Sequence, residues 1–295
     1  MKKCLAFVLS GGGARGALQV GALRALIEAG WKPELLVGTS VGAMNAACLA
    51  LHGVSQTGLD VVKQAWQYAA QNCLLKPNQS WLTLRAMINR PDSHTITSLR
   101  AFFLAFGATP SLRFGDIPNI RLALVTADLN TGCPIIYGSD PDHNVLDGLL
   151  ASTALPPWVM PLENDGRYLV DGGALSNLPI EPALRLGATE IIALDLTDPT
   201  CVPDTGHPFN RFFEKLSYAV CLRQSELEIA LARARGVPVH HIVLRSPVPT
   251  PVWDFSMYRE LITCGYETAC QELPNRKRPH NLWPASWRQT SVQHD

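Results

Sequence analysis

Apolar residues near the start of the chain follow a pattern that occurs twice. Residues 4–9 form a continuous apolar run, which is typical of a strand buried on both faces of a parallel sheet. Three glycines follow, and small and apolar side chains then recur at helical spacing over residues 18–29 until Gly30, a residue type that commonly ends a helix. A second apolar run at residues 35–37 leads through a glycine-containing turn into a small-residue helix at residues 43–51. The order strand, tight turn, helix is therefore predicted twice in succession.

The rest of the chain continues this alternation. Further strands are expected at residues 122–127, 134–137, 168–170, 191–196 and 241–244, and a long helix at residues 209–235. Strands that alternate with helices predict an α/β fold with a mostly parallel central sheet covered by helices on both faces.

One long segment has no clear strand. Residues 52–120 contain helix-like stretches, and we interpret them as a helical insertion or cap within a single domain at residues 1–273. Residues 274–295 carry prolines and a run of basic side chains and are expected to form a poorly ordered tail. The length of 295 residues is sufficient for one large α/β domain.

Composition argues against two classes of protein. Apolar residues make up 47% of the chain and charged residues 17%, which lies outside the composition of disordered chains. The 25 basic residues balance the 25 acidic ones, so no basic field favours a nucleic-acid partner. The low charged fraction leaves uncharged surface for apolar partners, which is a weak indication of lipid contact.

The cysteines and the start of the chain bear on its location. The eight cysteines include no C-x-x-C pair and no Cys/His cluster, so we expect reduced thiols and no metal site. Glycines interrupt the first apolar run, and no cleavage site of small residues follows, so no signal peptide is predicted. No apolar stretch approaches the roughly 20 residues that span a bilayer. We therefore expect a cytoplasmic protein, at most peripheral to a membrane.

The sharpest chemical signal is a G-x-S-x-G sequence formed by Gly38, Ser40 and Gly42 between a buried strand and a helix. The glycines allow a tight bend from which the serine hydroxyl projects, and the N-terminus of the following helix supplies positive potential. An ordinary strand-to-helix turn with Ser40 as the N-cap is the alternative interpretation.

A second signal is the run of Gly11, Gly12 and Gly13 followed by Arg15. Consecutive glycine N–H groups ahead of a helix suit either a phosphate or the oxyanion of a tetrahedral acyl intermediate. The nucleotide alternative is weaker, because no Gly-Lys-Ser/Thr follows and the second strand ends at Ser40 instead of an acidic residue. The neighbouring serine turn favours acyl transfer.

A serine nucleophile needs a base, and none of the eight histidines lies in a recognisable catalytic motif. Asp171 is the better candidate, since it ends a predicted strand and precedes Gly172 and Gly173, which allow close approach. Asp128 and Asp195 also follow apolar strands, so spacing alone leaves three candidate acids. The Asp-Gly-Gly context favours Asp171, whereas Asp128 fits a turn organiser.

Four motifs occur in a fixed order along the first two hundred residues. They are the glycine run at residues 11–16, the serine turn at 38–42, an Ala-Ser-Thr-Ala-Leu-Pro segment at 151–156 and Asp-Gly-Gly at 171–173. Together they resemble the oxyanion loop, nucleophile elbow, A-S-x-A-x-P segment and D-G-G/A motif of the patatin-like phospholipases, which are serine acyl hydrolases with a Ser-Asp dyad.

This resemblance implies a three-layer α/β/α fold and a lipid acyl hydrolase that cleaves carboxylic esters of phospholipids or lysophospholipids without cofactor or metal. Ser40 would attack the ester carbonyl, and Asp171 would accept its proton. The N–H groups of Gly12 and Gly13 would be the main donors to the oxyanion. Arg15 would shape the loop or meet an anionic head group.

Other functions stay open at this point. They are a soluble esterase or thioesterase for small acyl substrates, a non-catalytic lipid-binding protein and, last, a nucleotide-binding protein. The co-occurrence of Ser40, Asp171 and the glycine run argues against a pure binder. The apolar runs at residues 101–106 and 156–161 could line an acyl pocket or touch a membrane, with buried packing as the alternative. The expected partner is a lipid or acyl-ester substrate, and the sequence leaves peripheral membrane contact and oligomeric state open.

Overall fold

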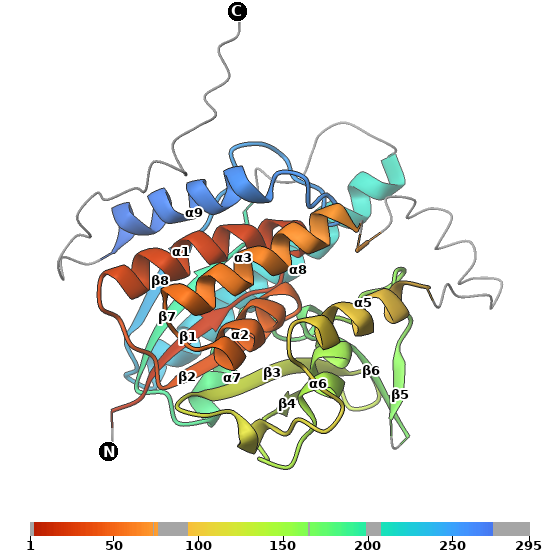
Figure 1. Cartoon of the computed structure of the whole chain (residues 1–295), viewed down its shortest axis with the longest axis horizontal. Coiled ribbons are helices and arrows are strands. Elements are labelled where there is room, and N and C mark those ends of the chain that lie inside the picture. Colours follow the sequence, from red (N-terminus) through yellow and green to blue (C-terminus); the bar gives the residue numbers. More distant parts are fainter. Residues whose placement is uncertain (1–2, 73, 76–93, 165, 199–207, 274–295) are drawn as a thin grey trace, which may run out of the picture.

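The structure is a computed structural model that describes residues 3–72, 74–75, 94–164, 166–198 and 208–273 (Figure 1). Its central eight-stranded sheet has the order β5-β6-β3-β2-β1-β7-β8, and β4 also pairs with β3. The strands are β1 (Leu5–Leu9), β2 (Leu35–Thr39), β3 (Arg121–Asp128), β4 (Cys133–Tyr137), β5 (Leu162–Asn164), β6 (Arg167–Asp171), β7 (Glu190–Asp195) and β8 (Val239–Val243). Pairing is parallel among β1, β2, β3, β7 and β8 and antiparallel where β4, β5 and β6 join.

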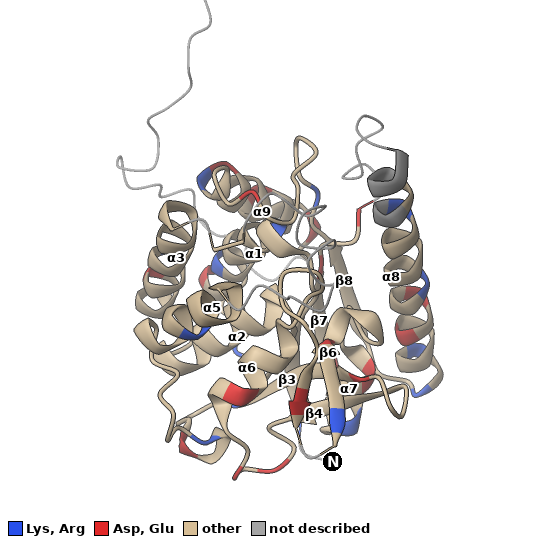
Figure 2. Ribbon diagram, turned by 90° about the vertical axis from the view of Figure 1, so that its right-hand side faces the viewer, with Lys and Arg blue, Asp and Glu red and all other residues tan. Residues whose placement is uncertain are grey.

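Helices cover both faces of this sheet, which confirms the three-layer α/β/α prediction. On one face lie α1 (Ala17–Glu28), α2 (Val41–His52), α3 (Gln56–Gln71), α5 (His94–Ala105), α6 (Val145–Ser152) and α9 (Tyr258–Glu272). On the other lie α7 (Ile180–Arg185) and α8 (Pro208–Ala234), on the right of Figure 2. Short 3-10 turns follow β1 (Gly13–Gly16), precede β3 (Phe114–Asp116) and follow β6 (Gly172–Ala174).

The side chains of β1 show how one strand supports two apolar cores. Phe7 and Leu9 are fully buried in the core that includes α1, α2 and α9. Ala6 and Val8, which alternate with them, are fully buried in the second core with residues of α7 and α8. Since neighbouring side chains of a strand point to opposite faces, a continuous apolar run is what such a central strand requires.

The strands expected from the sequence are present, with ends that differ by one or two residues. The sequence did not predict β5, because this three-residue strand has only one apolar residue and shows no alternating pattern. In the segment at 52–120, the described residues form α3, α5 and the 3-10 turn before β3, and no strand. Both helices place apolar residues in the same core as α1 and α2. The domain limits, and the role of this segment as insertion or cap, stay predictions, and the tail at 274–295 lies outside the described residues.

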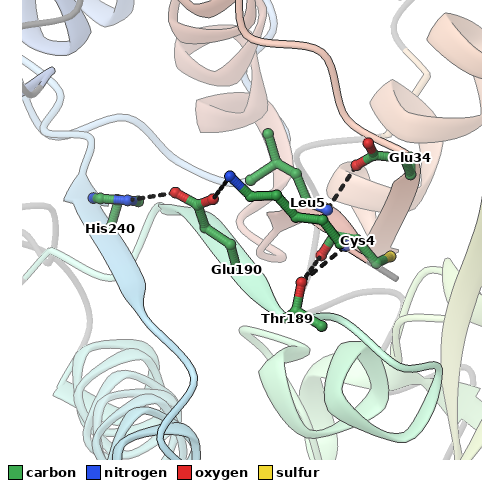
Figure 3. Close-up of polar contacts among 7 residues, drawn as sticks. Cys4, Leu5, Glu34, Thr189, Glu190 and His240 are labelled. Atoms are coloured by element: carbon green, nitrogen blue, oxygen red, sulfur yellow. Dashed lines mark hydrogen bonds and ion pairs between the residues drawn. The ribbon is translucent and has the colours of Figure 1, made fainter. Parts of the chain in front are cut away.

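Polar contacts fasten the amino-terminal ends of neighbouring strands (Figure 3). The N–H of Leu5 donates to the Glu34 carboxylate at 2.6 Å, which joins β1 to the residue before β2. The N–H of Cys4 donates to the Thr189 hydroxyl at 2.8 Å, and His240 of β8 contacts the Glu190 carboxylate at 3.2 Å. These contacts lie at the end of the sheet opposite to Ser40, which follows the carboxyl end of β2. Among the described residues, no helix is both long enough and apolar enough to cross a bilayer.

Candidate active site

Ser40 and Asp171 come together because two strands run toward each other along one edge of β3. Thr39, the last residue of β2, pairs in parallel with Val125. Asp171, the last residue of β6, pairs in antiparallel fashion with Thr126. Strand β4 pairs with residues 124–128 of β3, which overlap the residues of β3 that pair with β2 and those that pair with β6. Strand β4 therefore occupies one edge of β3, and β2 and β6 share the other edge. The carboxyl ends of β2 and β6 therefore meet, and Ser40 and Asp171 lie at the junction.

The backbone at Ser40 has the sharp turn that the G-x-S-x-G pattern predicts. Ser40 has φ 55° and ψ −125°, a conformation that a residue with a side chain rarely adopts. Its N–H donates to the Ser152 hydroxyl at 3.0 Å. A Cβ atom on Gly42 would overlap the carbonyl oxygen of Leu9, and one on Gly38 would overlap the carbonyl of Gly42. Gly42 is therefore required for the close packing of this turn against β1, and Gly38 for the tight bend of the turn itself.

Asp171 is a buried carboxylate with one oxygen left without a hydrogen bond. Its side chain is 5% exposed, and its Oδ1 accepts a hydrogen bond from the Gly173 N–H at 2.8 Å. Within the described residues, Oδ2 is buried and makes no hydrogen bond. Burial raises the pKa of Asp171 to about 6, against the opposing effects of the nearby Ser40 hydroxyl and the Gly173 N–H. The carboxylate is thus a stronger base than an exposed aspartate.

The other two candidate acids are engaged elsewhere. Asp128 accepts hydrogen bonds from the Asn130 N–H and the Thr131 hydroxyl, so it organises the turn after β3 as the sequence indicated. Asp195 accepts the N–H of Thr197 through one oxygen and contacts His241 at 2.9 Å through the other. Both carboxylates are as buried as Asp171, but neither retains an oxygen without a partner. This difference distinguishes Asp171.

The glycine run lies directly against the serine turn. A Cβ atom on Gly11 would be 3.2 Å from the Cβ of Ser40. The Gly11 N–H donates to the carbonyl of Asn177 at 3.1 Å, whereas the N–H groups of Gly12 and Gly13 have no hydrogen-bond partner among the described residues. Arg15 donates through Nε to the Gly12 carbonyl at 3.2 Å, so this side chain contacts the loop itself.

The segment at 151–156 connects the two candidate catalytic residues. The Ser152 hydroxyl is fully buried, accepts the Ser40 N–H and donates to the carbonyl of Val125 on β3 at 2.6 Å. Two residues further on, the carbonyl of Ala154 accepts the Asp171 N–H at 2.9 Å. The sequence marked this segment only through the family resemblance, and no spacing rule indicates these contacts.

The histidines of the described residues contact other groups. His241 contacts Asp195, His240 contacts Glu190, and a ring nitrogen of His143 accepts the Gly138 N–H. None of the described histidines is hydrogen-bonded to Ser40 or Asp171. The same part of the chain contains no group of three side chains arranged to hold a metal ion.

An apolar cavity begins one helical turn after Ser40. It lies between α2, α3, α5 and α6, and the space in it that is open to a water-sized sphere is about 30 Å³. Met44 and Cys48 line it from α2, Trp66 from α3, Phe102 from α5, and Phe106 from the turn that follows α5. Burial raises the pKa of the Cys48 thiol to about 12, as expected for an apolar wall. The apolar run at 101–106 therefore contributes mainly to packing and to this cavity.

Comparison with known proteins gives the family. The family model described as patatin-like phospholipase matches residues 7–184, which include the serine turn and Asp171. The chain belongs to the patatin-like phospholipase family.

Two curated relatives and one solved structure illustrate the likeness. The chain is 29% identical over 288 residues to patatin-like phospholipase domain-containing protein 7 of Mus musculus, with 89% of this chain and 20% of that protein covered. It is 26% identical over 306 residues to lysophospholipase nte1 of Aspergillus terreus, with 95% of this chain and 19% of that protein covered. The chain thus spans about a fifth of the length of these relatives. Human GIVD cytosolic phospholipase A2 shares its fold, with a TM-score of 0.52 at 13% identity over 90% of this chain and 61% of that chain.

Proposed function

We propose that this chain is a lipid acyl hydrolase that cleaves carboxylic ester bonds of phospholipids or lysophospholipids through a Ser40-Asp171 dyad. The observation that carries the proposal is the junction of β2 and β6. It brings a serine with a strained backbone next to a buried carboxylate that retains one oxygen without a partner. Membership of the family and the names of the relatives, which include a lysophospholipase, support the class of substrate.

The first half of the reaction forms an acyl-enzyme. The Ser40 Oγ bonds to the ester carbonyl carbon while its proton passes to Asp171. The tetrahedral intermediate then breaks its bond to the alcohol of the substrate, and this leaving group takes the proton from Asp171. Because burial raises the pKa of Asp171 to about 6, the carboxylate is ionised at neutral pH and still accepts a proton more readily than an exposed aspartate.

The second half hydrolyses the acyl-enzyme. Water passes a proton to Asp171 as its oxygen bonds to the acyl carbon. The second tetrahedral intermediate then breaks its bond to the Ser40 Oγ and releases the fatty acid, while Asp171 returns the proton to the Ser40 Oγ. Asp171 acts as the base in both halves and ends each in its ionised form, so the dyad needs no histidine.

The glycine run stabilises the negative oxygen in both halves. Gly12 and Gly13 supply the N–H groups, because these donors have no other partner in the described residues. The N–H of Gly11 is already bonded to the carbonyl of Asn177, so Gly11 is not an oxyanion donor. Because Gly11 has no side chain, the loop can lie close to Ser40. Arg15 fixes the loop through its bond to the Gly12 carbonyl.

The cavity beside α2 is apolar apart from Asn45, and its lining begins one turn after Ser40. Its space of about 30 Å³ is smaller than an acyl chain, so the side chains of the lining would have to move apart to admit one. The preference for a lipid ester over the substrate of a small-molecule esterase rests on the family and on the names of the relatives.

Release of fatty acid measured by mass spectrometry tests the proposal. Wild-type protein is incubated with lysophosphatidylcholine, phosphatidylcholine and a short-chain soluble ester, beside Ser40→Ala and Asp171→Asn. Asp128→Asn is the matched control, since Asp128 is an equally buried aspartate at a strand end. We expect fatty acid from wild type and Asp128→Asn and none above background from the other two. Hydrolysis of the soluble ester alone would favour the soluble esterase, and lipid binding without any hydrolysis would overturn the proposal.

A further inference from the structure

Four large apolar side chains form a solvent-exposed stripe along α8. They are Phe212, Leu216, Val220 and Leu227, with exposed fractions of 61%, 48%, 43% and 53%. Their spacing of four, four and seven residues places them on one face of the helix. We call these four residues the α8 stripe. A single exposed leucine is ordinary, but a stripe that extends over about four helical turns is an interaction surface.

The opposite face of α8 already packs against the loop that follows Asp171, so the stripe is not a core face left uncovered. Gln224 donates to the carbonyl of Ala174 at 2.8 Å and accepts the N–H of Asn177 at 3.2 Å. Glu228 accepts the Ser176 hydroxyl at 2.6 Å. Ile229 and Ala232 on this face are buried in the second core. The helix therefore has two faces, one holding the catalytic loop and one apolar and open to solvent.

The N-terminal half of α8 lies at the active-site end of the sheet. The helix connects the carboxyl end of β7 to the start of the parallel strand β8, so its first turns lie at the same end as Ser40. Figure 1 shows this end of α8 reaching beyond the sheet. Two further exposed apolar side chains lie on loops: Met160 between α6 and β5, and Val248 after the carboxyl end of β8. These loops meet through the rings of Trp158 and Trp253, whose centroids are 5.9 Å apart.

The charges beside the stripe indicate what covers it. Of the side chains described on α8, the exposed charged ones are Lys215, Arg223, Glu226 and Arg233. Arg223 and Glu226 form an ion pair at 3.2 Å, so the excess of basic charge comes from Lys215 and Arg233. A second copy of the chain on this face would bring two basic surfaces together, which is unfavourable. Apolar side chains flanked by basic ones suit a bilayer with anionic head groups.

We propose that the α8 stripe docks on the surface of an anionic lipid bilayer and holds the active-site end of the sheet at the membrane. The inference rests on the proposed function in one respect, because a lipid ester in a membrane must reach Ser40. The apolar side chains enter the region between head groups and acyl chains, while Lys215 and Arg223 lie among the head groups.

Sedimentation with vesicles tests the docking surface. Full-length protein carrying Ser40→Ala, which leaves the lipid intact, is mixed with vesicles of phosphatidylcholine alone or of phosphatidylcholine with phosphatidylserine. The stripe variant is Phe212→Ser with Leu216→Ser. The matched control is Leu129→Ser, since Leu129 is 54% exposed in the turn after β3 and lies outside α8. The same variants are also prepared with Ser40 intact. Their melting temperatures report on the fold, and their hydrolysis of a short-chain soluble ester reports on the active site.

We expect the protein to bind the vesicles that contain phosphatidylserine. The affinity of the stripe variant for the same vesicles should be lower by about tenfold or more. Lys215→Glu weakens binding in the same direction, and added salt weakens it further. Leu129→Ser binds as the parent does, and all variants hydrolyse the soluble ester equally when Ser40 is present.

Equal binding of the parent and stripe variants, or no binding of the parent, would overturn the docking surface even if the ester is hydrolysed. A dimer that dissociates in the stripe variant would assign the stripe to a second copy and also overturn it. Binding that depends on the stripe, with no ester hydrolysis by the wild type, would support the docking surface and refute the acyl hydrolase instead.

Discussion

The hydroxyl of Ser152 accepts a hydrogen bond from the backbone N–H of Ser40 at 3.0 Å. The same hydroxyl donates to the carbonyl of Val125 on β3 at 2.6 Å, so one small side chain fastens the serine turn to the central sheet. Since the backbone of Ser40 has a positive φ, this bond helps to hold a conformation that the chain would otherwise leave. Ser152 is therefore a positioning residue for the nucleophile.

Replacement of Ser152 tests this role. Ser152→Ala removes the bonds to the Ser40 N–H and to the Val125 carbonyl, which we expect to lower the free energy of unfolding by about 1–3 kcal/mol. We also expect the rate of Ser40 acylation by a soluble ester to fall about tenfold or more, because the nucleophile is no longer held in place. Stopped-flow kinetics and thermal unfolding measure the two effects.

Thr153→Val is the control for Ser152→Ala. The Thr153 hydroxyl is also buried and donates to the carbonyl of Leu149, but it does not contact the serine turn. This variant should lose stability while its acylation rate per folded molecule stays at the wild-type value. If both variants slow acylation equally, Ser152 has no special role in positioning.

The pH dependence of acylation follows from the environment of Asp171. Burial raises the pKa of Asp171 to about 6, and only the ionised form accepts the proton of Ser40. The acylation rate should therefore increase as the pH rises through about 6 and reach a plateau above it. A pre-steady-state pH profile with a soluble ester measures this. A midpoint near 4, the value of an exposed aspartate, would contradict the assigned environment.

The same pKa predicts that Asp171 destabilises the folded protein at neutral pH. An aspartate in the unfolded chain titrates near 3.9. Because the folded state has the higher pKa, it binds the proton more tightly, and stability declines as the pH rises between about 4 and 6. Asp171→Asn removes this ionisation, so we expect it to raise the free energy of unfolding at pH 7 by about 2–3 kcal/mol.

Chemical denaturation at several pH values checks this gain in stability. The advantage of Asp171→Asn should decrease as the pH falls through 6 and disappear below about 4. Asp128→Asn should instead lose stability, because both oxygens of Asp128 accept hydrogen bonds from its turn. An Asp171→Asn variant less stable than wild type at pH 7 would show that the carboxylate makes a favourable contact.

Arg15 is predicted to act through the glycine run. Arg15→Met removes the bond to the Gly12 carbonyl, so we expect kcat for a soluble ester to fall about tenfold while KM stays constant, because the oxyanion forms only in the transition state. Arg24→Met, which removes the pair with Glu28 and the contact with the Tyr266 ring but does not touch the glycine run, should leave both constants unchanged. A raised KM for lipids with anionic head groups and an unchanged kcat would instead place Arg15 at the head group.

Much of the architecture could be predicted because its signals are local. Residues 4–9 and 35–37 read as buried strands since both of their faces are covered. Gly38 is required by close packing within the turn itself, whereas Gly42 is required by its approach to Leu9 of β1. Strand β5 could not be predicted, since its three residues are held by pairing with β6 and not by burial.

The arrangement of the site depends on contacts between distant residues. Nothing in the sequence states that β2 and β6 share one edge of β3, which is what brings Asp171 to Ser40. Spacing alone could not separate Asp171 from Asp128 and Asp195, because all three follow strands. Only the hydrogen-bond partners of the carboxylates distinguish them. The contact of Ser152 with Ser40 likewise joins residues 112 positions apart.

The most direct test of the account is to label the protein with a fluorophosphonate and to map the adduct by peptide mass spectrometry. The account predicts one adduct on Ser40, absent in Ser40→Ala, greatly slowed in Asp171→Asn and formed at the wild-type rate in Asp128→Asn. An adduct on another residue, or labelling of Ser40 that proceeds equally fast in Asp171→Asn, would contradict the dyad.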